Sequence, residues 1–261
     1  MSENDTGQTF WDHLEELRSA LMRIVGAALL CGIVAFFFKD LLFEIVLAPT
    51  KSNFITYDLL NRLGEVTGVE IEPFSIDLIN TNLAAQFIIH MRTALLAGLL
   101  CASPYVLFCV LRFIAPALYS TERKTLFTVV FCGYVMFLLG MLLCYFIIFP
   151  MTVHFLGTYQ VSSDVENLIS LESYISMFLR MSLLLGIVFE LPMICWLVAK
   201  LGFIEASTMR NYRRHAVVVI LIVAAIITPT SDIVTLLLVS LPMWLLYEIS
   251  ISVVSKTNKQ S

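Results

Sequence analysis

Charged residues are scarce in this sequence. Of its 261 residues only 14% are Asp, Glu, Lys or Arg, whereas 59% are hydrophobic, and the mean hydropathy is +0.89. A soluble domain of this length needs far more polar surface. The composition therefore indicates a polytopic membrane protein. The formal net charge of -4 has no large basic patch behind it, so we expect no binding to nucleic acid.

Catalytic and metal-binding motifs are also missing. The sequence has no GxxxxGK[ST], so it does not hydrolyse nucleotide through a P-loop, and it has no HExxH, GxSxG or paired catalytic aspartates. The four histidines lack ligand spacing, and the six cysteines lie in apolar stretches without a CxxC. We therefore expect no enzyme, no cofactor and no metal site, and interpret the cysteines as small hydrophobic residues.

Long apolar runs dominate what is present. They are six in number: Leu21 to Phe43, Leu83 to Leu111, Leu126 to Phe149, Tyr174 to Ala199, His215 to Thr228 and Ile233 to Val254. At about 1.5 Å per helical residue, four of them cross a hydrocarbon core of roughly 30 Å, and the last two are short or marginal. Backbone groups in lipid must be satisfied within the segment, and barrel-type alternation is absent. The predicted fold is an all-α polytopic membrane protein with six transmembrane helices and short fifth and sixth spans.

An even number of spans places both chain ends on one side of the membrane. Most Lys and Arg residues fall on that side: Arg18, Arg23, Arg112, Arg123, Lys124, Lys200, Arg210, Arg213, Arg214, Lys256 and Lys259. Only Lys39, Lys51 and Arg62 lie in or near the opposite loops. The positive-inside rule therefore predicts cytoplasmic N and C termini.

The chain reads as one transmembrane domain, residues 1–261, without a soluble domain or repeat. Residues 1–20 are expected to form a cytoplasmic amphipathic helix, residues 44–82 an external loop with a short helix at TYDLLNRLG, and residues 255–261 a cytoplasmic tail.

A cluster of acids, HLEELR, precedes the first apolar run. Thr9 is the predicted cap of this helix. Glu15 has Arg18 at i+3 as a local partner, whereas Glu16 faces Ser19 and Ala20 at the equivalent positions. Glu16 is therefore expected to lack a local helical cation.

Other charges fall inside or between the apolar runs. Glu190, in GIVFELP, is surrounded by apolar residues, and an acid at the centre of a membrane helix costs roughly 2.5 to 3.5 kcal/mol. It is either a functional carboxylate or a hydrogen-bonded link between helices. Glu122 follows Ser120 and Thr121, where an acid also suits the first turn of a helix. Arg92 and Arg180 lie about a third of the way in from the outer ends of their spans, so their stems can snorkel outward.

Five motifs in one order carry a resemblance. The segments HLEELR, FIAPALYSTER, FELP, ITPTSD and LPMWLLYE are arranged around the six spans as in TatC, the signal-peptide-receptor subunit of the twin-arginine protein translocase. The chain resembles this family over nearly its whole length. The resemblance implies a concave, glove-shaped bundle of six helices that binds the paired arginines of signal peptides on folded export substrates.

The resemblance also implies roles for particular residues. The signal-peptide-binding positions match Glu16, Glu122, Phe113 and Leu118, and the positions of the translocation or concave face match Glu190, Pro49 and Asp232. For Asp232, capping of the sixth helix is an alternative explanation. A guanidinium offers a planar fork to a carboxylate, so two adjacent arginines suit two separate acids better than lysines would.

The resemblance further implies single-span partners of the TatA and TatB type, a multimeric receptor complex in the bacterial cytoplasmic membrane, and transport driven by the proton gradient. A proton-coupled small-solute permease that uses Glu190 is the alternative. Inverted repeats and broken midplane helices would favour it, and neither is found in convincing form in the sequence.

Overall fold

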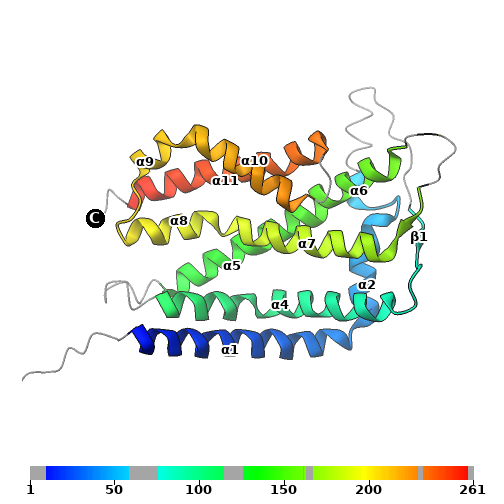
Figure 1. Cartoon of the computed structure of the whole chain (residues 1–261), viewed down its shortest axis with the longest axis horizontal. Helices are drawn as coiled ribbons and strands as arrows, with labels where there is room; N and C mark the ends of the chain where they lie inside the picture. The colour runs from blue at the N-terminus through cyan, green and yellow to red at the C-terminus, as the bar shows by residue number, and fades with distance from the viewer. Residues whose placement is uncertain are drawn as a thin grey trace, which may run out of the picture.

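The computed structural model is a bundle of long helices that run in alternating directions (Figure 1). It describes residues 10–58, 76–114, 126–160, 162, 167–228 and 232–257. The described elements are α1 (Phe10–Phe36), α2 (Lys39–Leu47), the 3-10 helix η1 (Ala48–Thr50), β1 (Leu78–Ile79), α4 (Ala85–Ile114), α5 (Leu126–Leu143), the π-helix η4 (Cys144–Ile148), α6 (Phe149–Thr158), β2 (Ile169–Ser170), α7 (Leu171–Phe189), α8 (Leu191–Lys200), α9 (Ala206–Asn211), α10 (Arg213–Ile227) and α11 (Ile233–Thr257).

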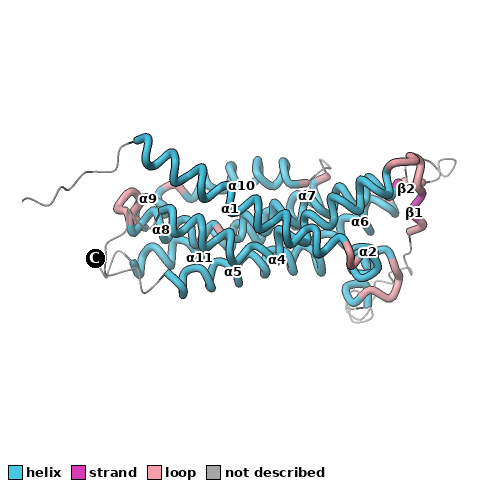
Figure 2. Tube along the Cα trace, turned by 90° about the horizontal axis from the view of Figure 1, so that it is seen from below, coloured by secondary structure: helices cyan, strands magenta, loops and turns pink. Residues whose placement is uncertain are grey.

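The two ends of the bundle differ in content. The first and last described helices begin and finish at the same end, which we call the terminal end (Figure 1). The opposite end carries α2, β1 and β2 and is called the cap end (Figures 1 and 2). The first and last described residues therefore lie at one end of the bundle, which agrees with the prediction that both chain ends lie on one side of the membrane.

Five segments of the described chain are long and apolar enough to cross a membrane: Leu14–Phe36, Ala85–Phe113, Thr128–Thr158, Leu171–Lys200 and Ile233–Thr257. The predicted short fifth span is α10, whose 15 residues extend about 22 Å. Because that is less than the roughly 30 Å hydrocarbon core, the count of six spans stays a prediction. The sixth span was predicted to be short, and this is wrong: α11 continues for 25 residues through Pro242 and Glu248.

The first span also differs from the prediction. Residues 10–20 form no separate helix but the first turns of α1, and the predicted cap Thr9 lies outside the described residues. At its other end α1 stops at Phe36 instead of continuing to Phe43, and α2 leaves in a new direction (Figure 1). The ring of His90 on α4 stacks on Phe36 at 4.0 Å, and its Nε2 lies 3.1 Å from the Phe36 carbonyl oxygen. This contact satisfies a carbonyl that the end of the helix leaves free.

Glycines allow the long helices to approach closely. A side chain at Gly98 of α4 would place its Cβ 2.3 Å from the Gly32 nitrogen of α1. Between α5 and α7, a Cβ at Gly140 would lie 2.7 Å from the Phe189 ring, and one at Gly186 would lie 2.8 Å from Phe137. Small residues at such crossings are typical of helices that pack within a membrane.

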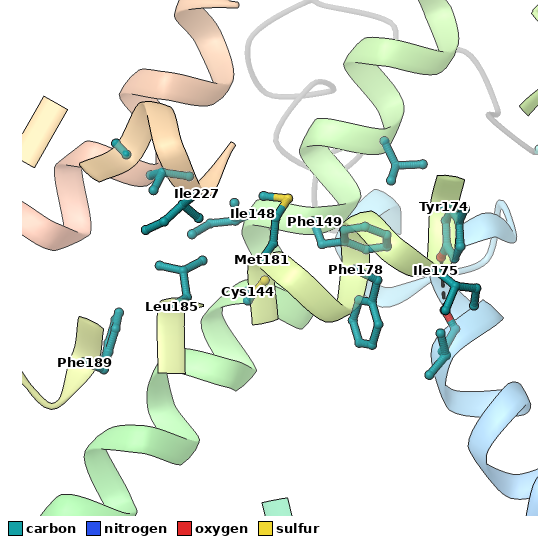
Figure 3. Close-up of a cluster of buried hydrophobic side chains, with 14 of the residues drawn as sticks. Cys144, Ile148, Phe149, Tyr174, Ile175, Phe178, Met181, Leu185, Phe189 and Ile227 are labelled. Carbon is teal, nitrogen blue, oxygen red and sulfur yellow. Dashed lines mark hydrogen bonds between the residues drawn. The ribbon is translucent and has the colours of Figure 1, made fainter. Parts of the chain in front are cut away.

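The largest buried cluster joins η4, α6 and α7 to side chains of α2, α4, α10 and α11 (Figure 3). Tyr174, Phe149 and Phe178 pack edge to face, with ring centroids 5.0 Å apart in both contacts of Phe149. Most side chains of α1, by contrast, are exposed on the outside of the bundle, as expected for a helix that faces lipid.

Two short strands tie the cap-end segments together. Leu78 pairs with Ile169 and Ile79 with Ser170 in a parallel ladder. Of the predicted external loop 44–82, residues 59–75 lie outside the described residues, and they include most of the short helix predicted at TYDLLNRLG.

Candidate functional site

Glu16 lies on an exposed part of α1 near the terminal end, with Glu15 and Arg18 exposed beside it. The predicted pairing of Glu15 with Arg18 is wrong, because the ion pairs of the described residues do not include it. The exposed positions let each side chain remain in solvent, where such a pair gains little. Glu16 also makes no hydrogen bond or ion pair with any described residue.

Phe113 is half-buried near the end of α4, and the two remaining signal-binding candidates, Leu118 and Glu122, fall in 115–125, outside the described residues. The last residues of α4 and the first residues of α5, which flank this segment, both lie at the terminal end (Figure 1). The segment therefore starts and finishes at the end that carries Glu16.

The contact between Gly32 and Gly98 shows that Glu16 and Phe113 lie at the same level of the bundle. From this contact, Glu16 is 16 residues back along α1 and Phe113 is 15 residues forward along α4. The two helices run antiparallel side by side (Figures 1 and 2). At about 1.5 Å per residue the displacements are about 24 and 22 Å in the same direction.

Glu190 occupies the break between α7 and α8. Pro192 has no amide hydrogen for the Val188 carbonyl, and α7 gives way to a separate helix at this point. The Glu190 side chain is buried, and its Oε1 has no hydrogen-bond partner among the described residues. A Cβ at Gly133 of α5 would lie 3.1 Å from Glu190 Oε2 and 3.5 Å from Leu107 of α4. The carboxylate therefore faces α5 at Gly133, where a larger residue would be in tight contact with it. A hydrogen-bonded link between helices finds no support at Oε1.

The structure does not gather Pro49 and Asp232 around Glu190. Pro49 is buried at the cap end, where its carbonyl oxygen accepts the Tyr57 hydroxyl at 3.0 Å. Asp232 Oδ2 accepts the Thr235 amide at 2.7 Å, so it caps α11 as the alternative explanation required. Glu190 is 19 residues along α7 from its cap-end start, about 28 Å away.

Sequence reasoning missed a network of hydroxyl groups at the cap end. The hydroxyls of Tyr145 and Tyr174 donate to the carbonyls of Ile45 and Val46 at 2.8 and 3.1 Å, which satisfies the end of α2. The donors lie 100 and 128 residues from their acceptors, so local spacing gave no signal.

The same network reaches the π-helix η4 of the third long span. Pro150 leaves the Phe146 carbonyl without its helical partner, and the hydroxyl of Thr56 donates to that carbonyl. Tyr57 also donates to the Pro150 carbonyl at 3.3 Å, and its burial raises the pKa of its hydroxyl to about 12. The sequence signal that could have indicated this contact was Pro150, which lies in an apolar segment and frees a helical carbonyl.

Two ion pairs were also missed. Arg213 of α10 donates to Glu248 of α11 at 2.7 Å, and an oxygen of Glu172 lies 4.0 Å from a nitrogen of Arg92. The first pair explains how α11 carries an acid within its span, because Arg213 compensates the charge.

The comparisons with known proteins agree with this architecture. The family model "Sec-independent protein translocase protein (TatC)" matches residues 12–242. A TatC protein of Blattabacterium is 33% identical over 96% of both chains, and one of Aquifex aeolicus is 34% identical over 92% of both. A crystal structure described as the twin-arginine translocase receptor TatC superposes with a TM-score of 0.74 at 31% identity, covering 94% of this chain and 99% of the other. The chain belongs to the TatC family of Sec-independent protein translocase proteins.

Proposed function

We propose that this protein is the core receptor subunit of a twin-arginine translocase. It binds the twin-arginine signal peptide of folded proteins at the terminal end of the bundle, through Glu16 and Glu122, and takes part in their export across the membrane. Membership of the TatC family supports the role, since relatives of matching length and fold are described as translocase proteins and translocase receptors.

The observation that carries the binding site is the position of Glu16. Its carboxylate is exposed, has no partner among the described residues, and lies level with Phe113, at the start of the segment that contains Leu118 and Glu122. An exposed carboxylate keeps both oxygens available for an incoming guanidinium. Phe113 and Leu118 supply apolar contacts beside it.

Two separate acids suit two adjacent arginines. Each guanidinium presents paired N–H groups to one carboxylate in a bidentate contact, whereas a lysine offers a point charge without this fork. The receptor therefore distinguishes a twin-arginine from a twin-lysine signal by geometry as well as by charge.

Glu190 serves a later step. Glu190 lies about 28 Å from the cap-end start of α7, within the membrane-spanning segment Leu171–Lys200. Its Oε1 has no hydrogen-bond partner among the described residues. We place the hydrophobic region of the signal, or the passing substrate, on the concave face that carries it. Pro49 and Asp232 shape the cap end of this path through the buried turn after α2 and the cap of α11.

Single-span subunits of the TatA and TatB type complete the transport machinery within a multimeric complex, and the proton gradient drives transport. The protein is a multi-pass membrane protein. We place it in the bacterial cytoplasmic membrane with the terminal end on the cytoplasmic side, in line with the Lys and Arg distribution.

Site-specific crosslinking to a twin-arginine signal peptide tests the binding site. Glu16→Gln or Glu122→Gln should abolish the crosslink while membrane insertion stays intact. Glu15→Gln is the matched control, since it removes the same charge from the neighbouring residue of α1 and should keep the crosslink. A twin-lysine signal gives the specificity arm. Unchanged crosslinking in both the Glu16 and Glu122 variants would exclude this assignment.

A second experiment separates recognition from transport. Glu190→Ala should impair export of a folded reporter more than it impairs crosslinking at the terminal end. Equal loss of both would place Glu190 in recognition instead.

A further inference from the structure

Two cations of this chain lie inside membrane-spanning segments on exposed surface. Arg92 is in the segment Ala85–Phe113 and Arg180 is in Leu171–Lys200, and both side chains are exposed. A charge at this depth needs a compensating group. Arg180 has neither an ion pair nor a hydrogen bond with any described residue. Its compensation must come from outside the described chain.

Helix geometry directs both side chains toward the cap end. Side chains of an α-helix tilt toward its N-terminus, and α4 and α7 both begin at the cap end (Figure 1). Arg92 is seven residues after the start of α4 and Arg180 is nine residues after the start of α7, which puts their Cα atoms about 10 and 14 Å from those starts. Long stems at this depth bring the guanidinium groups up to the headgroup region at that end.

Arg92 contacts α7, the helix that carries Arg180. Arg92 reaches across to Glu172 in the first turn of α7, at 4.0 Å, with side chains that stay 52% and 46% exposed. Arg180 lies eight residues farther along α7, a rise of about 12 Å and a turn of about 80° from Glu172. Glu172 is the only acid in the sequences of α4 and α7, so the three groups sum to one positive charge.

The surface below Arg180 is apolar. Leu184 and Ile187 follow at i+4 and i+7, which places them on the same side of α7 and deeper in the membrane, and Ile187 is 50% exposed. Leu184 is half-buried, so the apolar surface below the cation is half-buried at Leu184 and exposed at Ile187. A cation above apolar surface matches the two parts of a phospholipid, a phosphate above acyl chains.

We propose that Arg180, assisted by Arg92, binds the phosphate of an anionic phospholipid in the leaflet at the cap end. The guanidinium of Arg180 donates to the phosphodiester oxygens, and an acyl chain lies along Leu184 and Ile187. The single excess positive charge selects a headgroup with one net negative charge, such as phosphatidylglycerol, over phosphatidylcholine, whose own ammonium cancels its phosphate. This site is independent of the signal-peptide site at the other end.

Native mass spectrometry of the full chain released from nanodiscs of equal phosphatidylglycerol and phosphatidylcholine tests the proposal. The wild type should retain phosphatidylglycerol in preference to phosphatidylcholine. Arg180→Gln should weaken that retention about tenfold, as for loss of one charge-assisted contact. Arg92→Gln should have a smaller effect, because Glu172 already engages Arg92. Arg180→Lys, which keeps the charge without the fork, should fall between the wild type and Arg180→Gln.

The control is Arg210→Gln, which removes an exposed arginine of α9 at the terminal end and should leave retention unchanged. Equal retention by the wild type and Arg180→Gln would overturn the proposal, as would equal retention of the two lipids. Displacement of the lipid by millimolar inorganic phosphate would indicate a site for free phosphate instead. Loss of a co-purifying protein from Arg180→Gln, with phosphatidylglycerol unchanged, would assign Arg180 to a protein partner.

Discussion

The cap end and the terminal end of this bundle use polar groups in opposite ways. At the cap end, tyrosine hydroxyls donate to backbone carbonyls of α2 and η1. Tyr174 and Tyr57 are buried, and Tyr145 is half-buried. At the terminal end, the carboxylates of Glu15 and Glu16 are exposed and have no partner among the described residues.

The difference separates stability from binding. A buried donor or acceptor without a partner costs free energy, so each cap-end contact contributes to holding α2, η4 and α7 together. An exposed carboxylate contributes little to stability but remains free for a ligand. Substitutions at the cap end should therefore lower the free energy of unfolding, whereas substitutions at the terminal end should change binding alone.

The crossing of α1 and α4 connects the two ends, and Gly98→Leu should have the largest effect. A Cβ at Gly98 would lie 2.3 Å from the Gly32 nitrogen, so the helices must separate. We expect a loss of about 3 kcal/mol in the free energy of unfolding, at the upper end for overpacking, and weaker signal crosslinking as well. Thermal unfolding in detergent measures this loss of stability. Gly26→Ala is the control, because a Cβ there meets nothing within 4 Å. Equal melting temperatures of the two variants would contradict the close contact of α1 with α4 at Gly98.

Tyr174→Phe should have the next largest effect. It removes the hydroxyl that donates to the Val46 carbonyl at 3.1 Å and leaves that carbonyl buried without this partner. The expected loss is about 1 to 3 kcal/mol in the free energy of unfolding, with signal crosslinking unchanged. Tyr159→Phe, at a tyrosine that is 62% exposed, is the matched control and should melt like the wild type. If Tyr174→Phe lost signal binding without losing stability, the conclusion that cap-end contacts serve stability and not binding would be contradicted.

Much of this arrangement could be predicted from the sequence, because hydropathy and helix length depend on local composition. The apolar runs predicted four long helices and the short α10, and the Lys and Arg distribution agrees with both described chain ends at one end. Asp232 was recognised as a possible cap because its role depends only on the next three residues. That Glu16 lacks an ion pair with a described residue followed from its local helical neighbours.

The rest depends on contacts between distant segments. The break after Phe36 is stabilised by His90, 54 residues away, and the charge of Glu248 is compensated by Arg213, 35 residues away. Neither partner can be chosen from spacing, so the first span was predicted to end at Phe43 instead of Phe36, and the sixth was predicted too short. The pairing of Glu15 with Arg18 failed for the opposite reason: helical spacing permits a surface pair but does not require it.

The pH dependence of the cap end should follow Tyr57. Its pKa is raised by burial from the ordinary value of 10.0 to about 12, so the folded protein keeps this proton after the unfolded chain has lost it. The contribution to stability is complete below pH 10 and is lost as the pH rises from 10 to about 12. Chemical unfolding followed across this range should show a steeper decline for the wild type than for Tyr57→Phe. Parallel declines would show that Tyr57 does not carry the dependence.

The ion pair of Arg213 with Glu248 should contribute less. The two side chains are 49% and 28% exposed, and such pairs are worth about 0.2 to 1 kcal/mol. Arg213→Gln alone should cost more than the double substitution Arg213→Gln/Glu248→Gln, since the single variant leaves Glu248 uncompensated within α11. A double-mutant cycle of unfolding free energies measures the coupling, and additive losses would mean that the pair is not coupled.

Glu16→Gln should have the smallest effect on stability, within about 0.5 kcal/mol, because it changes an exposed side chain without a partner among the described residues. The same change should abolish crosslinking to a twin-arginine signal, since a neutral amide cannot offer a guanidinium two acceptor oxygens. Unfolding and crosslinking are measured on one preparation, with Glu15→Gln beside it. If Glu16→Gln lowered the free energy of unfolding as much as Tyr174→Phe, the terminal end would also stabilise the fold. The separation of binding from stability would then be wrong.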